Sequence, residues 1–155
     1  MALKSNFDAN NSMNSLFRQR DNLYERIINS FIRAGENFIT NARGQMQDHA
    51  MGTYKDQTTN LRNSIGYFIF LNGQPVKEVG DLLINRAKVQ DLIKPSGIQL
   101  IGIAGMNYAS YVESKGYNVI SYQADICIVD LAMYLGVVGV IDQGTAARLE
   151  ETFIP

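Results

Sequence analysis

The chain has 155 residues, of which 46% are hydrophobic and 19% are charged, and its formal net charge is −1 at pH 7. That length is enough for one compact domain whose core needs neither a disulfide nor a structural metal. Because the net charge is close to zero, the composition argues against non-specific binding to nucleic acid, which requires a basic surface. The single cysteine, Cys127, excludes an internal disulfide and a thiolate metal site, and the single histidine, His49, excludes zinc triads and most Ser-His catalytic arrangements.

The N-terminal part of the chain is predicted to be an arm followed by one long helix. Residues 1–13 are polar and rich in asparagine, so we expect a flexible arm there, with residues 14–155 forming a single α+β domain. Between Asn14 and Asp48 apolar residues recur at steps of three, four or seven, as on one face of an amphipathic helix: Leu16, Leu23, Ile27, Phe31, Ala34, Phe38, Ala42 and Met46. Gly35 and Gly44 lower the intrinsic stability of this helix and are candidates for a bend or for the start of a second helix.

The apolar stripe of this helix is wide, because Tyr24, Ile28, Ile32 and Ile39 lie beside it, and we therefore expect the helix to pack on a sheet. Arginines slightly outnumber acids on the rest of the helix. That surplus fits either a face toward DNA or an acidic neighbour, or an ordinary solvated helix face.

A hairpin is predicted to follow the polar, turn-rich residues 52–60. Aromatic and β-branched residues favour a strand over Ser64–Leu71, and Asn72-Gly73 is the strongest short signal for a tight hairpin turn. Gln74–Val79 should therefore pair antiparallel with that strand. Pro75 cannot donate a hydrogen bond to a neighbour, so we expect this second strand at an edge of the sheet.

Five shorter elements are expected in the rest of the chain. Asp81–Ile93 has helical spacing and is predicted to be a short helix or an ordered loop, while Gly97–Ala104 and Tyr117–Tyr122 have the composition of strands. Asp125–Leu135 fits a helix or a buried strand, because periodicity does not separate the two there. Thr145–Glu151 is a short helix candidate. The fold class predicted from these elements is α+β, with a long N-terminal helix packed on an antiparallel β-sheet and further short helices.

No segment of the sequence has the features of a membrane anchor or of a catalytic centre. The apolar stretch Ile126–Ile141 has 16 residues, too few to span a bilayer, and we expect no membrane association and a reducing cytoplasmic environment. Neither a phosphate-binding loop nor a dinucleotide fingerprint occurs. Paired acids such as Glu150 and Glu151 have no pocket signature around them. We therefore predict no catalytic, cofactor-binding or metal-binding residues.

Two short motifs stand out instead. The first is Leu61-Arg62-Asn63-Ser64-Ile65, which precedes the predicted hairpin, and the second is Tyr108-Ala109-Ser110-Tyr111-Val112-Glu113. We expect Leu61, Ile65, Tyr108 and Val112 to share one apolar cluster. Arg62 is the cation expected near Glu113, where a guanidinium and a carboxylate can form a bidentate pair that fixes two elements in register.

In order and separation, these motifs resemble those of the tail-completion (head–tail joining) proteins of long-tailed bacteriophages. The resemblance covers residues 16–122. In that family a Leu-Arg-x-Ser-Ile element opens a strand, and a Tyr-Ala-x-Tyr-Val-Glu element lies where the sheet returns. This chain departs from the family in having Thr59-Asn60 where Thr-Gly is common, and Ser114-Lys-Gly-Tyr117 where an aromatic residue followed by Gly-Thr is common.

The resemblance implies an α+β virion protein without a cofactor and without enzymatic activity, which acts as a ring-forming subunit of the head–tail connector. Its implied partners are further copies of itself and other phage head, neck and tail proteins. DNA would pass through the ring without sequence-specific binding, for which a near-zero net charge is suitable. The alternatives are a tail terminator or head-closure protein of the same particle and, from another class, a small non-virion nucleic-acid-binding domain or enzyme.

Overall fold

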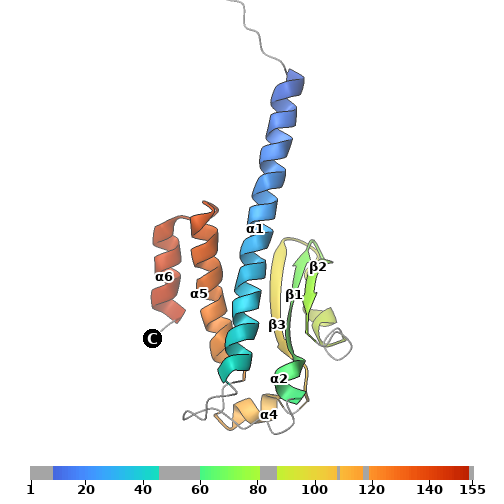
Figure 1. The fold of residues 1–155 in the computed structure, drawn as a ribbon, viewed down its shortest axis with the longest axis vertical. Coiled ribbons are helices and arrows are strands. Elements are labelled where there is room, and N and C mark those ends of the chain that lie inside the picture. The colour runs from blue at the N-terminus through green and yellow to red at the C-terminus, as the bar shows by residue number, and fades with distance from the viewer. Residues whose placement is uncertain (1–8, 46–59, 81–86, 108, 117–118, 154–155) are drawn as a thin grey trace, which may run out of the picture.

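The computed structural model describes residues 9–45, 60–80, 87–107, 109–116 and 119–153. It is an α+β fold in three layers, in which helix α1 lies between a three-stranded antiparallel sheet and the helix pair α5 and α6 (Figure 1). The predicted fold class is therefore confirmed. Among the described residues, no helix has the length and apolar character needed to cross a membrane.

Helix α1 (Ala9–Gln45) is the longest element, with 37 residues. It begins at Ala9 rather than at Asn14, so the last residues of the predicted arm belong to the helix, while residues 1–8 lie outside the described residues. Only its C-terminal half is covered: Ala34, Phe38, Ile39 and Ala42 are buried. Its N-terminal half extends past the other layers (Figure 1).

The helix runs through Gly35 without a break, because this glycine has a packing role. A Cβ atom at position 35 would lie 2.6 Å from the ring of Tyr67, so only glycine lets the ring approach the helix this closely. The phenol of Tyr67 donates a 2.8 Å hydrogen bond to Oε1 of Glu36. Burial, followed by the hydrogen bond to Glu36 and its charge, raises the pKa of Tyr67 above its ordinary value of 10.0. Gly35 thus fixes the distance between α1 and the sheet.

The sheet has the strand order β2-β1-β3, with β1 (Ile65–Leu71) in the centre and β2 (Gln74–Val79) and β3 (Ile98–Ala104) on either side. Both pairings are antiparallel. Asn72 and Gly73 adopt positive φ angles of 51° and 77°, as the predicted hairpin turn requires. The predicted edge position of the strand with Pro75 is confirmed, and the register of β2 shifts beside this proline.

Strand β1 is buried on both faces because different elements pack on each face of it. Ile65, Tyr67 and Ile69 face α1 and join the main core. Phe68 and Phe70 face the other way and pack with Val89 and Ile103 in a second cluster. Val89 comes from a helical segment that ends in the 3-10 helix η1 (Gln90–Leu92). The short helix predicted within Asp81–Ile93 is therefore confirmed for residues 87–92, and residues 81–86 lie outside the described residues.

The second half of the chain adds helices α4 (Ala109–Ser114), α5 (Ser121–Val137) and α6 (Gln143–Phe153). Asp125–Leu135, for which the sequence fits either a helix or a buried strand, is helical and lies within α5. The strand predicted over residues 117–122 is wrong for the described part, because Ser121 already begins α5; residues 117–118 lie outside the described residues. The predicted C-terminal helix is confirmed and is longer than expected. Asp142 caps it by accepting a 2.9 Å hydrogen bond from the amide of Thr145.

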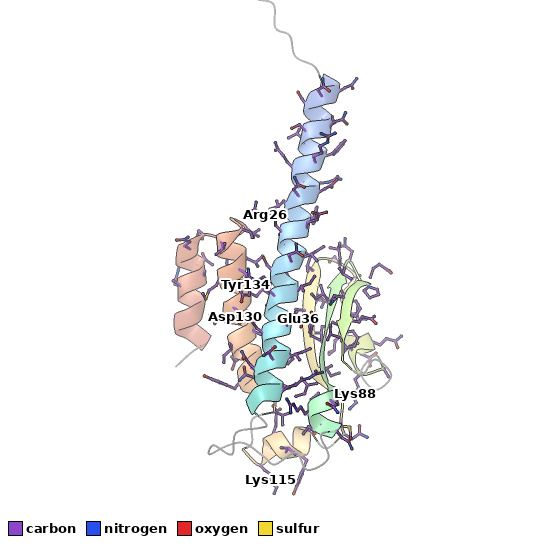
Figure 2. All side chains as sticks on the ribbon, viewed as in Figure 1. Arg26, Glu36, Lys88, Lys115, Asp130 and Tyr134 are labelled. Atoms are coloured by element: carbon purple, nitrogen blue, oxygen red, sulfur yellow. The ribbon has the colours of Figure 1, made fainter. Side chains whose placement is uncertain are left out.

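Helix α5 packs on the side of α1 that faces away from the sheet, and α6 packs on the outer side of α5 (Figure 1). The contact between α1 and α5 includes a polar group in which Nδ2 of Asn37 donates to Asp130 at 3.0 Å and to the hydroxyl of Tyr134 at 2.7 Å. Arg33 stacks over the Tyr134 ring at 4.5 Å. Arg26 donates a 3.0 Å hydrogen bond to the carbonyl of Val138 at the end of α5 (Figure 2). These bonds fix α5 in register along α1.

Candidate functional site

The two sequence motifs lie together at one corner of the molecule, below the C-terminal end of α1 (Figure 1). Leu61, Ile65 and Ala109 are buried in the main core, and Val112 packs against it half-buried. The predicted cluster is therefore confirmed for Leu61, Ile65 and Val112, whereas Tyr108 lies outside the described residues. Tyr111 points away from this cluster, with its side chain exposed.

The first motif does not open the strand directly. Residues 60–64 form a short helical segment, α2 (Asn60–Ser64), and the strand begins at Ile65. Ser64 is the residue that makes this arrangement possible. Its hydroxyl donates a 2.7 Å hydrogen bond to the carbonyl of Leu61, which closes the turn.

Ser64 also joins the two motif regions across the sheet. Its hydroxyl accepts a hydrogen bond from the amide of Met106 at 3.3 Å, and its carbonyl accepts one from the amide of Gly105 at 3.0 Å. The carbonyl of the next residue, Ile65, accepts a 2.7 Å bond from Arg43 at the end of α1. A buried polar side chain is tolerated in a core only when it is bonded in this way. Ser64 therefore links α2 to the segment after β3, and the neighbouring Ile65 links it to α1.

Glu113 caps helix α5. Its Oε1 atom accepts hydrogen bonds of 2.9 Å from the amide of Ile120, the amide of Ser121 and the hydroxyl of Ser121. Partial burial opposes ionisation of the carboxyl, but these hydrogen bonds outweigh it and lower the pKa of Glu113 below its ordinary value of 4.5. The sequence predicts Arg62 as the partner of Glu113. In the structure, the carboxylate instead accepts hydrogen bonds from the start of α5, where a negative charge is favoured.

These contacts are those of a packed structural corner. Among the residues that the structure describes, no group of three His, Cys, Asp or Glu side chains could hold a metal ion. Cys127 is buried in the main core. Burial, with a further contribution from the charge of Asp130, raises the pKa of the Cys127 thiol to about 12, so it is not a thiolate nucleophile at neutral pH.

Two exposed apolar surfaces are more informative about partners than the corner is. We define the α1 stripe as the large apolar side chains exposed on the N-terminal half of α1, namely Met13, Leu16, Phe17, Leu23 and Tyr24. Sequence reasoning placed some of these residues on the side of the helix that packs on the sheet. It could not find where the sheet ends along the helix, because the periodicity is the same on both halves.

The second surface is the α5–α6 pocket, an open hollow of about 240 Å³ lined by Met133, Gly136, Val137, Gln143, Ala146 and Ala147. Its rim is apolar, since Met133 and Val137 are both exposed. One feature of the sequence points to this pocket: Ile126–Ile141 is more apolar than a helix with one buried face requires.

The edge of the sheet is a third surface with binding capacity. Within the described part of the chain, β2 pairs only with β1, so its outer backbone groups face away from the sheet. Such an edge can accept a strand from another chain.

Comparison of the chain with protein-family models, with curated proteins and with solved structures found no match.

Proposed function

We propose that this protein is a structural virion protein of a tailed bacteriophage, which forms the ring of the head–tail connector and has no enzymatic activity. The observation that carries the proposal is the corner built by the two motifs. Leu61–Ile65 and Ala109–Glu113 are far apart in the sequence, and Ser64 and Glu113 each make several hydrogen bonds that hold the corner together. Motif residues with structural roles are what a protein that acts by assembling requires.

The exposed surfaces support the same proposal. A helix that extends past its own domain, an open apolar pocket and a strand edge on which no other described strand pairs are all suited to repeated contacts with neighbours. Contacts between two different surfaces of identical subunits generate a closed ring when the rotation between neighbours closes. The net charge of −1 suits a channel that DNA passes through without being held.

The test is made on particles. An antibody-labelled or tagged copy of the protein should be found at the junction of head and tail in virions, and deletion of its gene should yield filled heads and complete tails that are not joined. Supplying the intact gene in trans should restore joining, and supplying a gene that lacks residues 1–12 should show whether that segment is needed. Absence of the protein from virions, or normal joining without its gene, would refute the proposal.

Purified heads, purified tails and complete virions also distinguish the connector from the alternative functions. A tail terminator would be present in purified tails before joining, and a head-closure protein would be present in purified filled heads and would be needed to retain DNA. A non-virion protein that binds nucleic acid would instead retard DNA in a gel and be missing from all particle fractions.

A further inference from the structure

The N-terminal half of α1 exposes an apolar face that the described part of the chain does not cover. Every residue from Met13 to Arg26 is exposed. Leu16 and Leu23 are seven residues apart, as are Phe17 and Tyr24, so these pairs share one face of the helix. A helix without tertiary packing is only marginally stable in water. The α1 stripe therefore has the pattern of a helix face that packs on another surface.

The molecule's own helices end below this stripe. The bond from Arg26 to the carbonyl of Val138 marks the upper end of α5, and α1 continues beyond it (Figure 2). The α5–α6 pocket of the same molecule is lined by residues of α5 and α6, and α6 lies on the side of α5 that faces away from α1 (Figure 1). A second copy of the chain can bring its α1 stripe to this pocket.

The pocket has the shape and chemistry to receive large apolar side chains. Gly136 of α5 and Ala146 of α6 approach closely because both are small, and a Cβ atom at position 136 would lie 3.7 Å from that of Ala146. Val137 is 79% exposed, which is unusual for a valine in an otherwise packed helix pair. Burial of such a patch on association is favourable in proportion to its apolar area.

The segments that carry the two surfaces have net charges of opposite sign. Residues 9–26 carry three arginines against two acids, whereas residues 121–148 carry three acids against one arginine. Opposite charge favours and orients the contact between stripe and pocket. Two α1 stripes placed side by side would instead bring together two segments of the same net positive charge, so the net charges favour the pocket over a symmetric pair of helices.

We propose that the α1 stripe of one subunit docks in the α5–α6 pocket of the next, and that this head-to-tail contact builds the ring. This inference rests on the proposed connector function and specifies which surfaces join neighbouring subunits. Because the two surfaces differ, each subunit donates a helix to one neighbour and accepts a helix from the other.

The experiment uses two variants of the full-length protein, each with one surface damaged. The donor variant carries Leu16→Glu and Leu23→Glu, and the acceptor variant carries Val137→Glu. All three positions are exposed, so the fold should persist, which circular dichroism checks. Leu92→Glu is the matched control, because Leu92 is equally exposed but lies on η1, away from both surfaces.

Sedimentation velocity between about 10 µM and 1 mM should show assembly of the wild type and of the Leu92→Glu control, and at least about 30-fold weaker self-association of each damaged variant. A mixture of the donor and acceptor variants should form heterodimers and nothing larger, since one intact contact remains per pair. The chain has no tryptophan. A Phe17→Trp reporter should therefore shift its emission to shorter wavelength on assembly, and should not do so when Val137→Glu is added.

Three results would overturn the inference: a wild type that stays monomeric throughout this range, a Val137→Glu variant that assembles like the wild type, or a mixture that forms no heterodimer. If rings form but the damaged variants form them equally well, other surfaces join the subunits and the connector proposal stands. The connector proposal itself fails only on the particle experiments above.

Discussion

Replacing Leu61 by alanine is the most direct test of the motif corner. Leu61 is 0% exposed and belongs to the main core with Ile65, Ala109 and residues of α1. The change removes three carbon groups. At about 0.8 kcal/mol for each buried group, the transfer cost alone is about 2.4 kcal/mol.

The cavity left behind adds to this cost. The neighbours of Leu61 come from several elements that are tied together by the Ser64 hydrogen bonds, so they cannot fully collapse into the space. We therefore expect a loss of about 3–4 kcal/mol in the free energy of unfolding, inside the usual 2–5 kcal/mol range for this substitution. For a chain of this size, the melting temperature should fall by about 10 °C.

Urea unfolding followed by circular dichroism, at a concentration where the protein is monomeric, measures the loss. Leu92→Ala is the control, because the same atoms are removed from a side chain that is 56% exposed, and its effect should stay within about 0.5 kcal/mol. A Leu61→Ala loss no larger than that of the control would show that the motif does not support the core.

Three further predictions concern the caps, the glycines and the thiol. Glu113→Gln should lower the free energy of unfolding by about 1 kcal/mol at pH 7. Because the folded pKa of Glu113 lies below 4.5, the charge contributes fully above that pH, and its contribution is lost as the pH falls through the folded pKa. Urea titrations at decreasing pH should therefore show a shrinking difference in stability between the wild type and Glu113→Gln. Gly35→Ala should cost about 1–3 kcal/mol, because its Cβ would collide with the Tyr67 ring. Gly44→Ala, with nothing within 4 Å of the added atom, should instead stabilise the helix by up to about 1 kcal/mol; equal effects of the two glycine changes in thermal melts would contradict the packing role of Gly35. Cys127 should resist iodoacetamide in the folded protein and react once urea unfolds it, because it is 5% exposed and its pKa is raised; rapid alkylation under native conditions would argue against this burial.

Much of the fold could be predicted because the relevant signals are local. The long helix follows from an apolar repeat, and the hairpin follows from Asn72-Gly73, whose positive φ angles few other residue pairs adopt. The edge position of β2 follows from the missing amide hydrogen of Pro75.

The errors fall where contacts between distant segments decide the local structure. Residues 119–122 contain valine, isoleucine and tyrosine and have the composition of a strand, but the Glu113 carboxylate caps a helix there. Helix α5 lacks a clear period because α1 covers one side of it and α6 another, so apolar residues occur around most of its circumference.

The roles of individual site residues were the hardest to predict. Gly35 looked like a point of weakness in the helix, and only the position of Tyr67 explains why glycine is required. Glu113 was expected beside Arg62, whereas its hydrogen bonds go forward along the chain to Ser121. The α1 stripe and the α5–α6 pocket depend on where neighbouring elements end, and a periodic pattern carries no information about that.

The unbroken course of α1 gives the molecule a lever. At 1.5 Å per residue the segment from Gly35 to Ala9 is about 39 Å long, so a tilt of about 10° at the Gly35–Tyr67 contact displaces its tip by about 7 Å. In a ring joined through that tip, the thickness of a single side chain at the pivot would change the spacing between neighbours and hence the diameter of the channel. Gly35, which is buried under the Tyr67 ring, would then determine the diameter of a channel that lies far from it.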